Sequence, residues 1–245
     1  MSNDPWFHAA PERWARDEIV LPPDESHHAA RVVRVAPPDV ITVTDGAGRV
    51  ARAAVRHVEA ERVLVEVLDE EVRPRLRPEI VVYQGAAKSG KLDDVVERLA
   101  ELGVAEMWAF ESERTVARWD PAKVSRLGDR WRAVARSAGK QSHNPYFLKA
   151  GAGVSWTELL RRVAKEPLGL TMWEGASLPM RTALLEQADR VAIVVGPEGG
   201  LTKDEAAALA DSGAPLVSLG PRILRTENAS IVAATALLFH YGLIG

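Results

Sequence analysis

Two short apolar runs near the C-terminus, each followed by a Gly-Pro loop, constrain the fold more than any other feature of the chain. The first run, residues 191–195, precedes Gly-Pro-Glu-Gly-Gly, and the second, residues 215–219, precedes Gly-Pro-Arg-Ile-Leu-Arg-Thr-Glu. Aliphatic runs of this length are typical of strands buried in a parallel sheet, and each loop leads into a helical pattern. Open α/β sheets bind ligands where such loops leave the strands, so we expect backbone groups of both loops to hold a small polar cofactor.

Alternating strand and helix patterns extend this sheet back to about the first third of the chain. Further strands are predicted at 80–83, 104–110 and 168–173, and helices at 91–101, 124–138, 156–163, 203 onward and 227–241. This alternation predicts a mostly parallel sheet with helices on both faces. Thr202 and Glu205 have the spacing of a capping box, which would fix the helix that begins at 203 against the first loop.

The N-terminal part has a different pattern of predicted secondary structure. Strand-like runs at 40–44, 50–58 and 63–68 are joined by turns, which predicts a small β-barrel or sandwich, and a short capped helix is predicted at 27–35. In residues 73–78 arginine alternates with proline and leucine, which predicts a stiff, basic linker. We therefore predict a first domain at 1–72, a linker at 73–79 and a second domain at 80–245.

Composition excludes several classes of protein. The chain has no cysteine, which excludes thiolate catalysis and disulfide scaffolds, and its six histidines show no metal-ligand spacing, so no metal is expected. No apolar run is long enough to span a membrane and the first residues lack the features of a signal peptide, so we expect a cytoplasmic protein. A net charge of −3 is unusual for a nucleic-acid-binding protein unless basic residues gather on one face.

The stretch Gly85-Ala-Ala-Lys-Ser-Gly-Lys91 has the glycine and lysine spacing of a phosphate-binding loop. Residue 92 is leucine, however, where that motif needs a hydroxyl to hold Mg²⁺. No later apolar strand ends in an aspartate suited to Mg²⁺ either. We therefore do not expect an NTPase.

The two C-terminal loops carry a family resemblance. Gly196-Pro-Glu-Gly-Gly-Leu-Thr202 and Leu219-Gly-Pro-Arg-Ile-Leu-Arg-Thr-Glu227 together resemble the RsmE family of SPOUT-class methyltransferases. Similarity continues at residues 28–35, 88–103 and 141–142, so it covers nearly the whole chain. Members of that family use S-adenosylmethionine to methylate N3 of a uridine in small-subunit (16S) ribosomal RNA.

The resemblance implies a fold and a set of partners. Residues 80–245 would form an α/β knotted, SPOUT-like trefoil methyltransferase domain, and residues 1–72 a PUA-like β-barrel that helps to grip RNA. The small and aliphatic residues of the last helix allow close packing within the subunit or across a two-fold axis. The resemblance favours the second, a homodimer that packs through this helix near the cofactor site. The residues implied to bind S-adenosylmethionine are Val195, Gly196, Pro197, Glu198, Gly199, Gly200, Leu219, Gly220, Ile223, Leu224, Arg225 and Thr226.

Three residues of the loops are candidates for catalysis. Arg225 can neutralise charge that develops on the uracil carbonyl oxygens. Glu198 and Glu227, the only carboxylates within the two loops, are candidate proton acceptors. Each also has a structural alternative, because Glu198 can brace its loop and Glu227 can favour the positive end of the last helix. Thr226 is expected to cap that helix.

RNA contacts are expected from basic and polar residues that lie outside the two loops. Cationic side chains there would add salt-dependent affinity for the RNA backbone, with solvated surface charge as the alternative. These residues are Arg31, Arg34, Lys88, Lys91 and Gln141.

The chain departs from the family pattern in two places. Asn228 stands where the family usually has threonine, and residues 141–142 run into His143-Asn144 where an arginine is usual. Two other functions stay open at this point. One is a SPOUT enzyme that acts on another RNA, such as transfer RNA, and the other is a non-catalytic RNA-binding module.

Overall fold

The computed structural model describes residues 4–15, 17–87, 90–115 and 118–245, which form two compact units. The first unit combines residues 1–75 with 136–147, and the second combines residues 76–135 with 148–245. The chain first passes from one unit to the other at residues 75–76, within the segment predicted as a basic linker. Each unit has its own hydrophobic core.

The first unit is built on a five-stranded sheet in the order β1-β3-β4-β5-β2. Its strands are β1 (Trp6–His8), β2 (Glu18–Val20), β3 (Val40–Thr44), β4 (Arg49–Glu59) and β5 (Arg62–Val72). The last three confirm the predicted strands. The first two were not predicted, because three residues are too few to show a period of two.

The helix predicted at 27–35 begins earlier than expected. An α-helix, α1, covers Pro23–His27, and a π-helical stretch, η2, covers His28–Val33. Proline is well placed in a first helical turn, where its missing N–H costs nothing, and no side chain caps this helix. Arg34 ends the segment in the left-handed conformation with φ 62°.

Residues 136–147 lie in the first unit, whereas the predicted boundary places them in the second domain. The Lys140 ammonium lies 2.5 Å from the carboxylate of the buried residue Glu25. The Tyr146 hydroxyl donates to the carbonyl oxygen of Arg73 at 2.6 Å. Because these partners are far apart in sequence, no local pattern indicates that the segment returns to the first unit.

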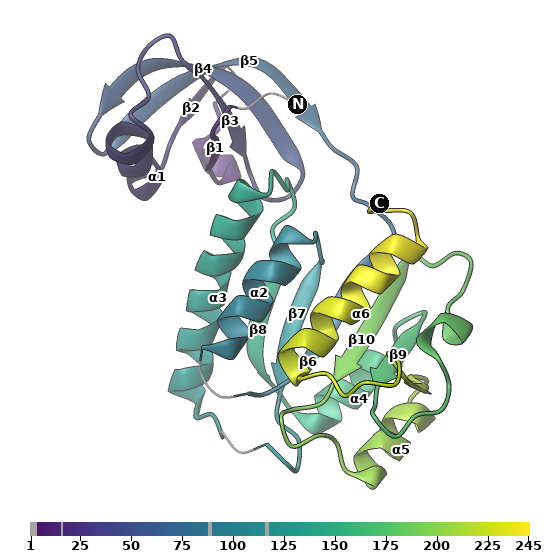
Figure 1. Ribbon diagram of the computed structural model, residues 1–245. Helices are drawn as coiled ribbons and strands as arrows, with labels where there is room; N and C mark the ends of the chain where they lie inside the picture. The colour runs from purple at the N-terminus through teal and green to yellow at the C-terminus, as the bar shows by residue number, and fades with distance from the viewer. Residues whose placement is uncertain (1–3, 16, 88–89, 116–117) are drawn as a thin grey trace. The chain divides into compact units, whose positions relative to one another are not determined.

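The second unit contains a six-stranded, all-parallel sheet in the order β11-β9-β10-β6-β7-β8 (Figure 1). Its strands are β6 (Glu79–Gly85), β7 (Glu106–Phe110), β8 (Lys149–Val154), β9 (Gly169–Met172), β10 (Arg190–Val195) and β11 (Leu216–Val217). Only β8 was not predicted. Its sequence, Lys-Ala-Gly-Ala-Gly-Val, has two glycines and little of the β-branched character that marks a strand.

Helices cover both faces of this sheet, as predicted (Figure 1). α2 (Lys91–Glu101) and α6 (Thr226–His240) lie side by side on one face, and α4 (Trp156–Val163) and α5 (Lys203–Asp211) lie on the other. Side chains alternate accordingly, so that Val81 and Tyr83 pack in the same core as Leu159 and Leu209. The remaining helices are α3 (Pro121–Gln141) and the 3₁₀ turns η1 (Pro11–Arg13) and η3 (Met180–Ala183).

Candidate functional site

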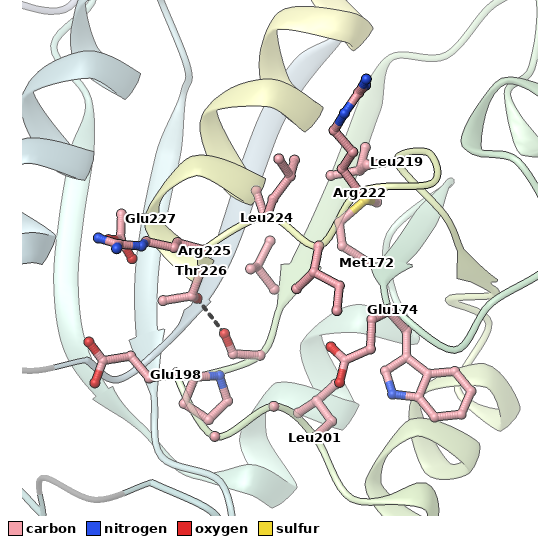
Figure 2. Close-up of a pocket in the computed structure, with 18 of the residues that line it drawn as sticks. Met172, Glu174, Glu198, Leu201, Leu219, Arg222, Leu224, Arg225, Thr226 and Glu227 are labelled. Atoms are coloured by element: carbon pink, nitrogen blue, oxygen red, sulfur yellow. Dashed lines mark hydrogen bonds between the residues drawn. The ribbon is translucent and has the colours of Figure 1, made fainter.

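The carboxyl ends of β9, β10 and β11 open into one cavity of about 490 Å³ (Figure 2). Because the three strands are parallel neighbours, the loops that follow them converge at the same edge of the sheet. The structure brings all twelve residues predicted to bind the cofactor to this cavity. The cavity is lined by Lys91, Met172, Trp173, Glu174, Val195, Gly196, Pro197, Glu198, Gly199, Gly200, Leu201, Ser218, Leu219, Gly220, Arg222, Ile223, Leu224, Arg225, Thr226, Glu227 and Ala229.

A third loop, which follows β9, was missing from the predicted site. It contributes Trp173 and Glu174, together with Met172 at the end of the strand. The signal was present, because a strand was predicted at 168–173 and the residue after a parallel strand faces the same edge as the other loops. Neither a glycine nor a proline immediately follows that strand to draw attention to it.

The first loop crosses directly over the end of β6. A Cβ added to Gly85 would lie 2.1 Å from the backbone nitrogen of Pro197, so only glycine allows this approach. The Thr226 hydroxyl accepts a hydrogen bond from the buried Gln84 amide at 2.7 Å and donates to the carbonyl oxygen of Gly196 at 2.5 Å. The prediction that Thr226 caps α6 is wrong, since Arg225 occupies the cap position without a side-chain cap. Thr226 instead ties the first loop to the last helix.

The paired glycines of the first loop serve the protein's own packing. A Cβ on Gly199 would lie 2.9 Å from the carbonyl oxygen of Arg114, and Gly200 has φ 71°. The prediction that Thr202 and Glu205 form a capping box is confirmed. The second carboxylate oxygen of Glu205 accepts the backbone N–H of residue 113 at 2.7 Å. The loop is therefore fixed before any ligand binds.

Lys91 joins the two candidate proton acceptors. Its ammonium lies 2.6 Å from Glu198 Oε1 and 3.4 Å from Glu227 Oε1. The hydrogen bond to Glu198 raises the pKa of the Lys91 ammonium. Glu227 Oε2 is buried and has no hydrogen-bond partner within the described chain. A lysine predicted to contact RNA is thus engaged by both carboxylates, and it begins α2 beside a buried Leu92, where a phosphate-binding loop would need a hydroxyl.

Arg225 is exposed at the cavity and forms no hydrogen bond or ion pair with the described residues. Its backbone is extended (φ −64°, ψ 149°), because it occupies the cap position just before α6. Figure 2 shows its guanidinium on the same side of the cavity as Glu227. The cation is therefore available to a ligand.

Three of the other predicted RNA contacts belong to the first unit. Arg31 and Arg34 are exposed on the π-helical stretch and at its end, and Gln141 is the exposed last residue of α3. Lys88 falls outside the described residues. His143, which replaces an arginine expected from the family, stacks on Trp6 with ring centroids 5.1 Å apart.

Membrane-spanning helices and metal-binding groups are both absent from the described residues. No helix among them is both long and apolar enough to cross a membrane. In the same part of the chain, no group of three or more histidine, aspartate or glutamate side chains is arranged to hold a metal ion.

Comparison with known proteins matches the chain to RNA methyltransferases over both units. The RNA methyltransferase domain family matches residues 74–238, and the RNA methyltransferase PUA domain family matches residues 21–68. The ribosomal RNA small subunit methyltransferase E of Mycobacterium bovis is 37% identical over 222 residues, which cover 89% of this chain and 85% of that protein. The Bacillus subtilis protein of the same name is 28% identical over 229 residues, or 90% of each chain.

Two solved structures with a bound cofactor are similar over nearly their full length. A Legionella pneumophila protein in complex with the cofactor S-adenosylmethionine has a TM-score of 0.88 and 26% identity, covering 97% of this chain and 98% of that one. The ribosomal RNA small subunit methyltransferase E of Neisseria gonorrhoeae, bound to S-adenosylmethionine, has a TM-score of 0.84 and 26% identity, with the same coverage.

Proposed function

The chain belongs to the ribosomal RNA small subunit methyltransferase E family, and on that premise we propose that it transfers a methyl group from S-adenosylmethionine to N3 of a uridine in small-subunit (16S) ribosomal RNA. The predicted fold class is confirmed as an α/β methyltransferase domain with a PUA domain, while the trefoil knot stays a prediction. The observation that carries the proposal is the convergence of three strand-end loops on one cavity.

The cavity suits S-adenosylmethionine in size and lining. Its volume of about 490 Å³ falls within the range of small-molecule sites. Apolar side chains of Met172, Leu201, Leu219 and Leu224 offer surface for the adenine ring, and the glycine-containing loops expose backbone N–H and C=O groups for its polar edges. Most of the proposed contacts are therefore made by backbone that is already fixed.

Bound S-adenosylmethionine supplies a methyl group that its sulfonium has already activated. The protein's tasks are to align the uridine and to stabilise the charge that develops on it. Uridine N3 carries a proton between two carbonyl groups, so negative charge spreads to those oxygens when the proton leaves. Arg225, exposed and without an internal partner in the described chain, is proposed to donate to one of them.

We propose Glu198 and Glu227 as the carboxylates that can accept the N3 proton. Their accessibility differs, because Glu227 keeps its second oxygen buried while Glu198 is exposed at the cavity. Glu198 is therefore the more accessible acceptor in this arrangement. Glu198→Gln should then slow methyl transfer more than Glu227→Gln at saturating substrates, and the reverse order would assign the role to Glu227.

The first unit is proposed to bind the RNA. The PUA domain match covers residues 21–68, which include the exposed Arg31 and Arg34. With Gln141, and with Lys88 and Lys91 from the second unit, these residues are proposed to contact the RNA backbone. Recognition through particular side chains would reconcile RNA binding with a net charge of −3.

We propose a cytoplasmic homodimer that packs through α6. The outer side of this helix exposes Val232 at 41% and Phe239 at 71%, and Ile223 in the preceding loop is 86% exposed. Apolar side chains exposed together on one helix indicate a protein contact. Light scattering should give the mass of two chains, and Phe239→Lys should shift it toward one.

Mass spectrometry of ribosomal RNA from cells with and without the gene tests the proposed reaction directly. The expected result is loss of one N3-methyluridine from the small-subunit RNA. In parallel, purified protein is given ribosomal small subunits and transfer RNA with labelled cofactor. Methylation of transfer RNA instead would favour the alternative substrate. RNA binding without any cofactor binding by calorimetry would favour the non-catalytic module.

A further inference from the structure

Glu174 brings a carboxylate to the cavity that no described residue neutralises. It is exposed, it lines the cavity, and it forms no hydrogen bond or ion pair within the described part of the chain. The other two glutamates of the cavity, Glu198 and Glu227, are both bound by Lys91. Glu174 is thus an acceptor without an internal donor.

The position of Glu174 is set by the fold. β9 ends two residues earlier, and the backbone N–H of Trp173 still donates to the carbonyl oxygen of Val217 at 3.1 Å. The carboxylate then faces the first loop, where a Cβ added to Gly200 would lie 3.6 Å from one of its oxygens and 4.0 Å from the other. Figure 2 shows this carboxylate turned toward the cavity on the side of Leu201.

We propose that Glu174 accepts hydrogen bonds from the ribose hydroxyls of S-adenosylmethionine, an inference that rests on the proposed function. An ionised carboxylate only accepts hydrogen bonds, and its two oxygens match the two neighbouring O–H donors of a ribose. An acidic residue beside a parallel sheet holds a ribose in the same way in dinucleotide-binding folds.

The cofactor also has two cationic groups, its sulfonium and its ammonium, and either is an alternative partner for the Glu174 carboxylate. Figure 2 places Arg225 across the cavity from Glu174. Because Arg225 is assigned to the methyl acceptor, the reacting sulfonium belongs on that far side. The apolar neighbours Met172 and Leu201 further suit the nucleoside end of the cofactor beside Glu174.

Calorimetry with three probes distinguishes these partners. The probes are S-adenosylmethionine, S-adenosylhomocysteine, which lacks the sulfonium charge, and methylthioadenosine, which also lacks the amino acid. Glu174→Ala should weaken all three by a similar factor, roughly tenfold to a hundredfold, because a hydrogen bond to a charged group is lost in each case. Glu174→Gln, which keeps one acceptor oxygen, should lose less.

The other patterns overturn the proposal. A loss confined to S-adenosylmethionine would assign Glu174 to the sulfonium, and a loss that spares methylthioadenosine would assign it to the ammonium. Unchanged affinity for all three would remove Glu174 from cofactor binding. Glu97→Gln, an exposed change on α2 away from the cavity lining, is the matched control and should bind like the wild type.

A double-mutant cycle with 2′-deoxy-S-adenosylhomocysteine sharpens the test. The wild type should prefer the ribose form, and Glu174→Ala should lose most of that preference; an undiminished preference would contradict the proposal. Failure of the proposed function itself gives a different result. In that case the wild type would bind none of the cofactor probes, whereas failure of the Glu174 role leaves wild-type binding intact.

Discussion

The two ends of the parallel sheet differ in whether their charged side chains are paired within the protein. At the amino end, where β6, β7 and β10 begin, Arg190 is surrounded by carboxylates. Its guanidinium lies 2.8 Å from Glu166, 3.1 Å from Glu106 and 3.4 Å from Glu79. All four side chains are at least partly buried, so this cluster joins three neighbouring strands through internal pairs.

At the carboxyl end, charged groups are left for ligands. Arg225 and Glu174 have no partner within the described chain, and Lys91 is shared between two glutamates. The same fold therefore separates a stabilising end from a binding end. This difference predicts that substitutions at the amino end change stability with little effect on the reaction, and that substitutions at the carboxyl end do the reverse.

Arg225→Ala should produce the largest effect. If the guanidinium stabilises charge on the uracil, methyl transfer should fall roughly 10²- to 10³-fold, as for loss of a single oxyanion donor. Affinity for S-adenosylmethionine and the midpoint of urea unfolding should stay close to wild type. Arg181→Ala, at an exposed arginine of η3, is the control, and an unchanged rate in Arg225→Ala would remove this residue from the mechanism.

Arg190→Met should have the second-largest effect, and that effect should be on the free energy of unfolding. Removing the cation leaves three carboxylates facing one another in a partly buried site. We expect a loss of about 2 kcal/mol in the free energy of unfolding, below the cost of breaking a fully buried pair because the guanidinium is partly exposed. Urea unfolding measures this, and a clear loss of cofactor affinity in the folded variant would contradict the separation of the two ends.

Lys91→Met distinguishes two roles of Lys91, which are to hold Glu198 and Glu227 together or to contact RNA. If Lys91 mainly holds Glu198 and Glu227 together, losing it should lower the turnover rate by roughly fivefold, as for a modest ion pair, and Lys91→Arg should restore most of it. The dependence of RNA affinity on salt should then match the wild type. A salt slope reduced by about one would instead show that Lys91 neutralises a phosphate.

The smallest expected effect is on the pH dependence of the free energy of unfolding. Burial alone would raise the pKa of Glu106, but the Trp108 indole N–H and the Arg190 guanidinium more than offset it and hold this pKa below its usual 4.5. A lowered pKa in the folded state adds stability above pH 4.5 that is lost as the pH falls further. The difference in the free energy of unfolding between wild type and Arg190→Met should therefore become smaller below that pH. A difference that becomes larger would show that the pair of Glu106 and Arg190 is not its cause.

The sequence predicted the elements of the second unit well because its strands are apolar runs between helical patterns. It also predicted the two loops of the cavity, because Gly-Pro residues at strand ends are local signals. The partners of these residues were not predictable in the same way. Lys91 and Glu198 are separated by 107 positions, and no local pattern reveals that their side chains meet.

Glu174 shows a second limit of sequence reasoning. A glutamate after a strand resembles any solvated charge until the neighbouring strands are known. The order β11-β9-β10 places its loop beside the loop that contains Gly200, and only this order makes Glu174 part of the cavity. Thr226 was misassigned for a similar reason, since its hydroxyl bonds Gln84 and Gly196 across strand and loop.

The return of residues 136–147 to the first unit has a consequence for biosynthesis. The carboxylate of Glu25 cannot meet the Lys140 ammonium until the ribosome has made more than half of the polypeptide. The domain that is translated first is therefore completed only after much of the second has emerged. A truncated product that ends at the linker would keep the Glu25 carboxylate buried without the Lys140 ammonium. The first unit therefore completes its folding only when part of the second half of the chain is present.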